Sequence, residues 1–183
     1  MIFTETALKG AFIVDVEPVN DERGMFARTW CQREFEAQGL KITWVQNNIS
    51  LNHKKGTLRG MHYQVPPYEE IKLVRCTAGS IYDVIIDLRP DSPTFGQHVG
   101  VILSADNHRA LYIPQNFAHG FQTLSDHTEV FYHMSAFYEA SAARGFRWDD
   151  SAFNIKWPEP LTVIADKDRA WPPFTRRNDE TQR

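Results

Sequence analysis

SIYDVIIDL (80–88) has the alternating apolar pattern of a β-strand, and the segments that follow it decide the class of fold. Two interleaved sets of residues, beginning at Ile81 and at Tyr82, would face opposite sides of this strand. Turn sequences such as RPDSPTFG (89–96) separate further short apolar segments, at 98–104, 110–114, 120–124 and 128–134. No helical pattern lies between them, which argues against a parallel β-α-β sheet. The sequence therefore predicts an all-β fold.

We expect a jelly-roll barrel with a few short peripheral helices, and an immunoglobulin-like sandwich is the alternative. CQREFEAQGL (31–40) is the clearest predicted helix, because Gly39 is a typical helix stop. A chain of 183 residues can bury a sizeable core in one domain. We therefore predict a single domain over 1–183, in which about 175–183 form a loose tail without an apolar anchor.

Composition restricts the class of protein. The formal net charge is −3 and 42% of the residues are hydrophobic, so neither a strongly basic nucleic-acid-binding protein nor a disordered chain fits. No apolar run approaches the roughly 18–20 residues that span a bilayer, and the first residues lack the layout of a signal peptide. Cys31 and Cys76 are expected to be free thiols in a reducing compartment. We expect a cytoplasmic protein without a nucleic-acid or membrane partner.

GTLRGMHYQ (56–64) places several polar groups in a segment that otherwise resembles a buried strand. Strict alternation would direct Arg59 and His62 to opposite faces, but a glycine inside a strand, here Gly60, often marks a bulge that redirects its neighbours. Both side chains would then face one cavity. The simpler interpretation is a hydrogen-bonded core histidine beside a surface arginine.

Other segments carry polar candidates that are weak when taken singly. Lys72 in IKLVRCT shares an alternating face with apolar residues, where a lysine needs a partner or a task. The simpler interpretations are a lysine at a strand end, core tyrosines and solvated loop carboxylates. The candidates are Lys72, His119, Tyr132, Tyr138, Asp166 and Asp168. With His62 they include a base, an acid, a cation and a carboxylate, the set required to remove a proton α to a carbonyl.

A metal site is the competing interpretation, because cupin-type jelly rolls bind metals through two histidine motifs. His62 and His119 stand at histidine positions of such motifs, and Glu69 stands at the acidic position. Gln64 replaces the second histidine, and glutamine is a poor ligand for zinc or iron. We therefore expect a cupin-like jelly roll that binds no metal and uses His62 as an acid/base.

The chain resembles the dTDP-4-dehydrorhamnose 3,5-epimerase family. The resemblance runs in order along the chain, through DERGMF (21–26), GTLRGMHYQ, DLRPDSPTFG (87–96), IPQNFAHGF (113–121) and DKD (166–168). It implies a homodimeric jelly-roll isomerase that needs no cofactor. The implied substrate is a nucleoside-diphosphate 6-deoxyhexose with a ketone at C4.

The resemblance also implies roles for individual residues. His62 would be the general base that removes the protons at C3 and C5, and Asp168 would hold its imidazole in the productive tautomer. Lys72 would stabilise the enolate oxygen at C4, and Tyr132 would return a proton from the opposite face. The implied substrate-binding residues are Arg23, Phe26, Arg28, Gln46, Asn48, Arg59, His119 and Tyr138.

Departures from the family pattern leave alternatives open. Arg28 stands where many members carry an acidic residue that helps recognise the base, so a CDP- or GDP-linked 4-keto sugar is an alternative substrate. Glu69 and Glu70 replace the usual glutamine before KLV, and His133 replaces the common lysine or arginine after the tyrosine. Inversion at one carbon only is a second alternative. A non-catalytic sugar-nucleotide-binding jelly roll is the alternative from another class of protein.

Overall fold

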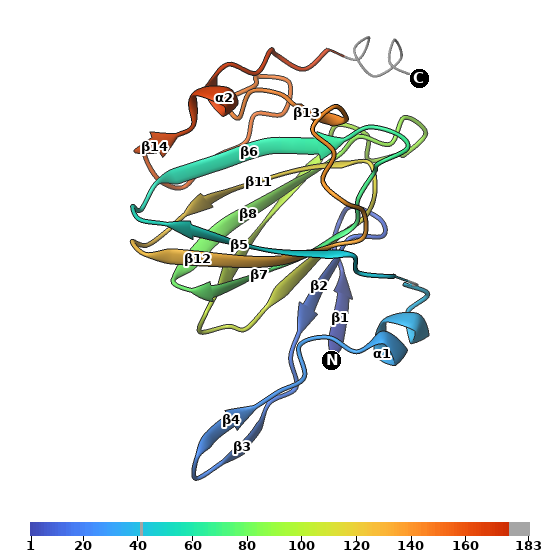
Figure 1. The fold of residues 1–183 in the computed structure, drawn as a ribbon, viewed down its shortest axis with the longest axis vertical. Coiled ribbons are helices and arrows are strands. Elements are labelled where there is room, and N and C mark those ends of the chain that lie inside the picture. Colours follow the sequence, from blue (N-terminus) through green and yellow to red (C-terminus); the bar gives the residue numbers. More distant parts are fainter. Residues whose placement is uncertain (41, 176–183) are drawn as a thin grey trace.

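The computed structural model describes residues 1–40 and 42–175, and two antiparallel sheets make up most of it (Figure 1). The first sheet has the strand order β1 (Ile2–Glu5), β2 (Phe12–Asp15), β10 (Ala110–Ile113), β7 (Lys72–Ala78), β12 (Thr128–Met134) and β5 (Gln46–Asn52). The second has the order β13 (Ala143–Gly145), β6 (Thr57–Gln64), β11 (Phe117–Thr123), β8 (Ser80–Asp87) and β9 (His98–Ser104), and β14 (Val163–Ile164) pairs in parallel with β6.

The chain crosses repeatedly between the two sheets. It leaves β6 of the second sheet for β7 of the first, returns to β8 and β9, crosses to β10, and returns again to β11 before it ends this path in β12. This alternation is the winding of a jelly roll. The prediction of an all-β jelly roll is confirmed, and the immunoglobulin-like alternative is wrong.

The core explains why both faces of β8 are buried. Ile81 and Ile85 point between the sheets and are fully buried there. On the other face of β8, Val84 packs in a second cluster with Phe146 and Phe153 from the C-terminal third of the chain. The segment after β12 thus covers the outside of the second sheet. Burial of each such side chain contributes roughly 1.5–3 kcal/mol to the stability of the fold.

Two short helices lie at the periphery. Helix α1 (Gln32–Ala37) confirms the predicted helix: Phe35 is its buried residue, and Gly39 follows it with a φ of +77°. Helix α2 (Asp166–Arg169) lies where the sequence indicated only loop carboxylates. No helix in the described part of the chain is long and apolar enough to cross a membrane. The expected loose tail, about 175–183, lies outside the described residues except for Thr175.

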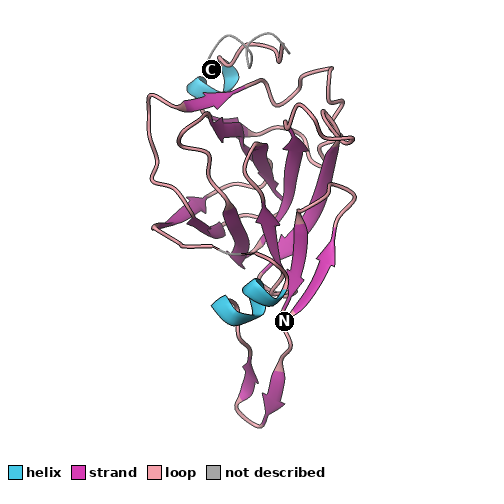
Figure 2. Ribbon diagram, turned by 90° about the vertical axis from the view of Figure 1, so that its right-hand side faces the viewer, coloured by secondary structure: helices cyan, strands magenta, loops and turns pink. Residues whose placement is uncertain are grey.

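A hairpin of β3 (Val19–Asp21) and β4 (Gly24–Phe26) projects away from the two sheets (Figure 2). All of its strand residues are exposed, and Phe26 has 75% of its surface accessible. Most of this large aromatic ring is thus open to solvent at the end of a projection. The hairpin is therefore a candidate for contact with another molecule.

Candidate active site

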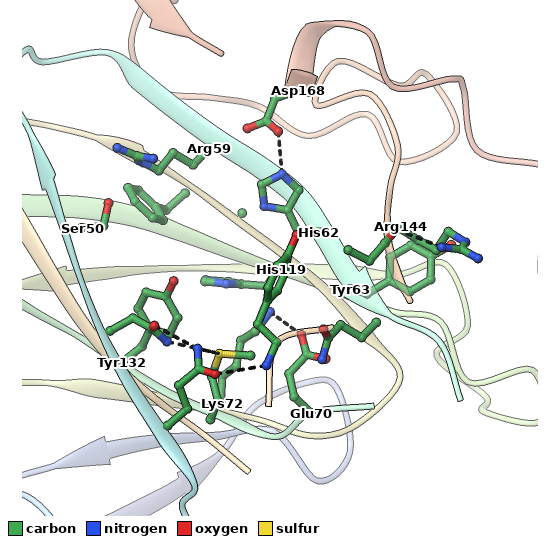
Figure 3. A pocket seen from close by; sticks show the side chains of 18 of the residues that line it. Ser50, Arg59, His62, Tyr63, Glu70, Lys72, His119, Tyr132, Arg144 and Asp168 are labelled. Carbon is green, nitrogen blue, oxygen red and sulfur yellow. Dashed lines mark hydrogen bonds and ion pairs between the residues drawn. The ribbon is translucent and has the colours of Figure 1, made fainter. Parts of the chain in front are cut away.

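A cavity of about 540 Å³ lies between the two sheets. One wall comes from β6 and β11 of the second sheet, and the opposite wall comes from β5, β7 and β12 of the first. Helix α2 closes one side (Figure 3). The structure brings together in this cavity the predicted residues Gln46, Asn48, Arg59, His62, Lys72, His119, Tyr132, Tyr138 and Asp168.

Gly60 allows two neighbours on β6 to share this cavity. Its φ is +126°, and a Cβ there would lie 2.6 Å from Gly120 Cα on β11. The register between the two strands shifts next to this contact, between His119 and Phe121. As a result Arg59 and His62 both line the cavity despite their odd spacing, as the sequence predicted.

His62 is paired with a buried carboxylate from the far end of the chain. Its Nε2 lies 2.6 Å from Asp168 Oδ1, and the backbone N–H of Gly60 donates to Asp168 Oδ2 at 3.1 Å. Burial by itself would raise the pKa of Asp168, but the contacts with His62 and Gly60 outweigh it and lower the pKa. The carboxylate therefore stays ionised and fixes the orientation of the imidazole.

Lys72 reaches the cavity from the first sheet, and its side chain is only 10% exposed. It shares its face of β7 with Val74 and Cys76, as the alternation predicted. The partner that such a lysine needs is Glu70, whose Oε1 lies 2.8 Å from Lys72 Nζ. The sequence indicated Glu70 only as a departure from the family pattern. Glu70 precedes β7 and Lys72 begins it, and the alternation of a strand does not predict a contact between two such residues.

Tyr132 faces the cavity from β12, so it belongs to the sheet opposite His62. Burial raises its pKa above the ordinary value, the positive charge of Arg59 lowers it, and the negative charge of Glu70 raises it further. The phenol is therefore protonated at neutral pH. A base on one wall and an acid on the other can act on opposite faces of a bound molecule.

A second histidine–carboxylate pair lies deeper in the same wall. His119 Nε2 lies 2.6 Å from Asp83 Oδ1, and Asp83 is completely buried. Sequence reasoning treated Asp83 as one of the alternating positions of 80–88 and missed this role. The available signal was that Asp83 shares its face of the strand with the apolar Ile81 and Ile85.

Polar side chains complete the cavity wall. Asn52 Oδ1 accepts a hydrogen bond from Arg59 Nε at 2.8 Å. Gln46 Nε2 donates to Asn48 Oδ1 at 3.0 Å, and the backbone N–H of Tyr138 donates to Gln46 Oε1 at 3.1 Å. Arg144 and Lys167 also line the cavity, although the sequence analysis did not select them. Four cationic side chains, Arg59, Lys72, Arg144 and Lys167, therefore surround a space that suits an anionic ligand.

Three predicted binding residues lie outside this cavity. Arg23 is at the tip of the β3–β4 hairpin, where it pairs with Asp21, and Phe26 is exposed on the same hairpin. Arg28 pairs with Glu34 of α1, at 2.6 Å. Within one chain these three residues do not line the cavity that holds Arg59 and His62, and the hairpin projects away from the two sheets (Figure 1).

The residue that replaces the second cupin histidine has a structural task. Gln64 Nε2 donates to the backbone oxygens of Tyr68 and Phe137, and Gln64 Oε1 accepts from the N–H of Glu139. Its polar atoms are thus committed to loops that frame the cavity. Within residues 1–40 and 42–175, no group of three or more histidine, cysteine or acidic side chains is arranged to hold a metal ion.

Fold and cavity together define the class of protein: a jelly roll with an acid–base site between its two sheets. Residues 5–176 match the family model described as dTDP-4-dehydrorhamnose 3,5-epimerase. The chain therefore belongs to the dTDP-4-dehydrorhamnose 3,5-epimerase family.

Individual relatives agree with this assignment. The dTDP-4-dehydrorhamnose 3,5-epimerase of Shigella flexneri is 46% identical over 165 residues, which are 90% of this chain and 91% of the relative. The crystal structure of the Bacillus anthracis enzyme with TDP and pyrophosphate bound superimposes with a TM-score of 0.92, at 42% identity, over 94% of this chain and 99% of that chain. A Legionella pneumophila structure in complex with dTDP-4-keto-L-rhamnose gives a TM-score of 0.89, at 36% identity, over 94% and 92% of the two chains.

Proposed function

We propose that this protein converts dTDP-4-dehydro-6-deoxyglucose into dTDP-4-dehydrorhamnose by inverting C3 and C5 of the sugar. The observation that carries the proposal is the placement of the His62–Asp168 pair and Tyr132 on opposite walls of one cavity. Related enzymes of known structure hold TDP or dTDP-4-keto-L-rhamnose, which supports the choice of a thymidine nucleotide.

In the proposed reaction His62 removes the proton from C3 or C5, each of which is α to the C4 ketone. The electron pair of the broken C–H bond moves into the C3–C4 or C4–C5 bond, and the carbonyl electrons move onto the C4 oxygen as an enolate. Lys72 stabilises that negative charge. Tyr132 then donates a proton to the carbon from the opposite face, which inverts the centre. The ketone itself accepts the electrons, so the proposal requires no cofactor.

The remaining cavity residues bind and orient the nucleotide sugar in this proposal. Arg59 and Lys167 would contact the diphosphate, because their positive charges attract its negative charge. His119 would contact the sugar, and Gln46 with Asn48 would recognise the nucleoside through amide hydrogen bonds. Tyr138 would contact the nucleotide through its ring, which is half exposed at the cavity wall.

A homodimer is part of the proposal, because the hairpin residues lie outside their own cavity. Ile49 and Leu51 are exposed on β5, which is an edge strand of the first sheet. Gln46 and Asn48 on the same strand line the cavity. A partner's hairpin that lies along β5 would cover the exposed apolar residues and bring its Arg23 and Phe26 to the mouth of this cavity. Arg28, at the base of the hairpin, would then lie next to the nucleobase.

A cytoplasmic location is also proposed. Cys31 and Cys76 form no disulfide; Cys76 is buried and Cys31 is partly accessible. Free thiols are typical of proteins in a reducing compartment. An activity assay on the soluble and membrane fractions of a native lysate tests this location.

Deuterium incorporation tests the proposed reaction. The protein is incubated in D2O with dTDP-4-dehydro-6-deoxyglucose and, in parallel, with its CDP- and GDP-linked counterparts. We expect two deuterons, at C3 and C5, with the dTDP sugar, measured by mass spectrometry and located by NMR. One deuteron would indicate an enzyme that inverts a single centre. Exchange only with another nucleotide would assign the change of specificity to Arg28, and binding without any exchange would support the non-catalytic alternative.

A further inference from the structure

Glu70 is a buried carboxylate next to the cavity that the mechanism above does not use. Its Oε1 forms the ion pair with Lys72, and its side chain is only 5% exposed. Its other oxygen, Oε2, is buried and meets no hydrogen-bond partner among the described residues. An unpartnered carboxylate oxygen in a protein interior opposes folding. A residue that lowers the stability of the fold in this way is a candidate for a role in function.

Lys72 depends on Glu70 for its position. The lysine side chain is flexible and carries a point charge, so its ammonium needs an acceptor to stay in one place. Within residues 1–40 and 42–175, Glu70 is the one partner that the ammonium meets at hydrogen-bond or ion-pair distance. Val74, the next residue on the same face of β7, has no polar side-chain atom. Figure 3 shows Lys72 and Glu70 side by side at the base of the cavity, away from His62 and Asp168.

We propose that Glu70 is a positioning residue for the epimerisation, which holds the Lys72 ammonium where the C4 oxygen of the substrate becomes an enolate. This inference rests on the proposed role of Lys72. Glu70 is one of the residues that line the cavity, but its free oxygen is buried, so in this proposal it acts through Lys72 and does not contact the sugar. A fixed cation stabilises a developing charge without the reorganisation that a mobile one would need.

The charge of Glu70 has a second effect, on Tyr132. That charge is one of the causes that raise the pKa of Tyr132, together with burial and against Arg59. Glu70 therefore favours the protonated phenol, the form that can act as an acid. The other charged or titratable groups facing the cavity from β6, β11, the β13 region and α2 are Arg59, His62, Tyr63, His119, Arg144, Lys167 and Asp168, and Tyr138 lines it from the segment after β12. Substitution of Glu70 leaves all of these in place.

The test compares Glu70→Gln with the matched control Glu69→Gln. Both substitutions remove one carboxylate from the same loop, but Glu69 does not line the cavity. We expect Glu70→Gln to lower kcat for deuterium exchange by about ten- to a hundredfold, with little change in KM. Its activity should also fall at a lower pH on the alkaline side, because the pKa of Tyr132 decreases. Glu69→Gln should match the wild type in both.

Glu70→Asp separates position from charge, and it also serves if Glu70→Gln fails to fold. The shorter side chain keeps the negative charge but withdraws it from Lys72, so kcat should fall while the alkaline limb of the pH profile stays in place. Wild-type kcat and an unchanged pH profile in a folded Glu70 variant would overturn the proposal. A wild-type protein that shows no exchange with any of the three nucleotide sugars would instead overturn the proposed function.

Discussion

His62 Nε2 and Asp168 Oδ1 lie 2.6 Å apart although 106 positions separate the two residues in the sequence. The pairing of β14 with β6 explains the contact, because it aligns Val163 with Thr57 and Ile164 with Leu58. Helix α2 begins directly afterwards and carries Asp168 to the histidine. The C-terminal segment therefore completes the site and also covers the second sheet.

Asp168→Asn should lower the exchange rate strongly while the fold is kept. An asparagine has nearly the same shape, but it cannot hold the imidazole in the same tautomer or stabilise its charged form. We expect a loss of about a hundredfold or more in kcat, measured by deuterium incorporation at C3 and C5. The matched control is Asp166→Asn, two residues earlier on the exposed side of α2. Equal activity of both variants would show that Asp168 does not orient the base.

His62→Ala should abolish proton exchange and leave nucleotide binding nearly unchanged. The imidazole is the proposed base, whereas the diphosphate would be held by Arg59 and the other cationic groups of the cavity. Deuterium incorporation measures the first property, and calorimetric titration with dTDP measures the second. Exchange at the wild-type rate would remove His62 as the base. Loss of dTDP binding would instead show that the histidine shapes the nucleotide site.

Tyr132→Phe should separate proton exchange from inversion. The base and the cation remain, so deuterium should still enter from the side of His62. The phenol that returns a proton from the opposite wall is absent, and the yield of inverted product should fall. NMR of the sugar distinguishes deuterated starting material from epimerised product. Full retention of epimerised product would refute the role of Tyr132 as the acid.

Short-range patterns predicted the fold, whereas the resemblance to the family implied most of the residues that the structure places around the cavity. Alternation identified the strands, and Gly60 in GTLRGMHYQ indicated why Arg59 and His62 share a face. The partners of the charged residues were not predicted in the same way. Asp83 meets His119 only through the register of β8 with β11, and Glu70 meets Lys72 only through the path of a loop.

For the residues on the β3–β4 hairpin, the sequence did not predict their position relative to the cavity. The resemblance assigned Arg23 and Phe26 to substrate binding, but it carried no information about where they lie within one chain. The structure places them on a projection outside the cavity. Local sequence can identify such a motif, whereas its position relative to the site depends on tertiary and quaternary structure.

Arg23→Ala and Phe26→Ala should therefore raise KM and leave kcat less affected. Their side chains would bind the nucleotide of a partner's substrate, far from the reacting carbons. Glu22→Ala, in the same hairpin turn, is the matched control. Sedimentation should show a dimer for the wild type at micromolar concentration. A monomer with wild-type activity would contradict both the dimer and the role of the hairpin.

Gly60→Ala should destabilise the protein more than Gly24→Ala. Both glycines have similar positive φ values, +126° and +124°, so both substitutions strain the backbone. At Gly60 the new Cβ would also lie 2.6 Å from Gly120 Cα, whereas nothing lies within 4 Å at Gly24. Backbone strain of this kind costs roughly 1–3 kcal/mol. We expect Gly60→Ala to exceed that cost in chemical denaturation, and equal losses for the two variants would show that β11 yields to the added carbon.

Asp87 should make folding stability depend on acid pH. Burial alone would raise its pKa, but hydrogen bonds from Arg89, Ser92 and Thr94 outweigh burial and lower the pKa to about 2. A carboxyl whose pKa is lower in the folded than in the unfolded state stabilises the fold above its unfolded pKa, and that contribution disappears as the pH falls through the folded value. Roughly 2 kcal/mol of stability should therefore be lost between about pH 4 and pH 2. Urea denaturation across this range should show a steeper loss for the wild type than for Asp87→Asn. The matched control is Asp91→Asn, an exposed carboxylate in the same loop, which should lose stability with falling pH as steeply as the wild type. If all three proteins lose stability equally steeply, Asp87 does not control the acid transition.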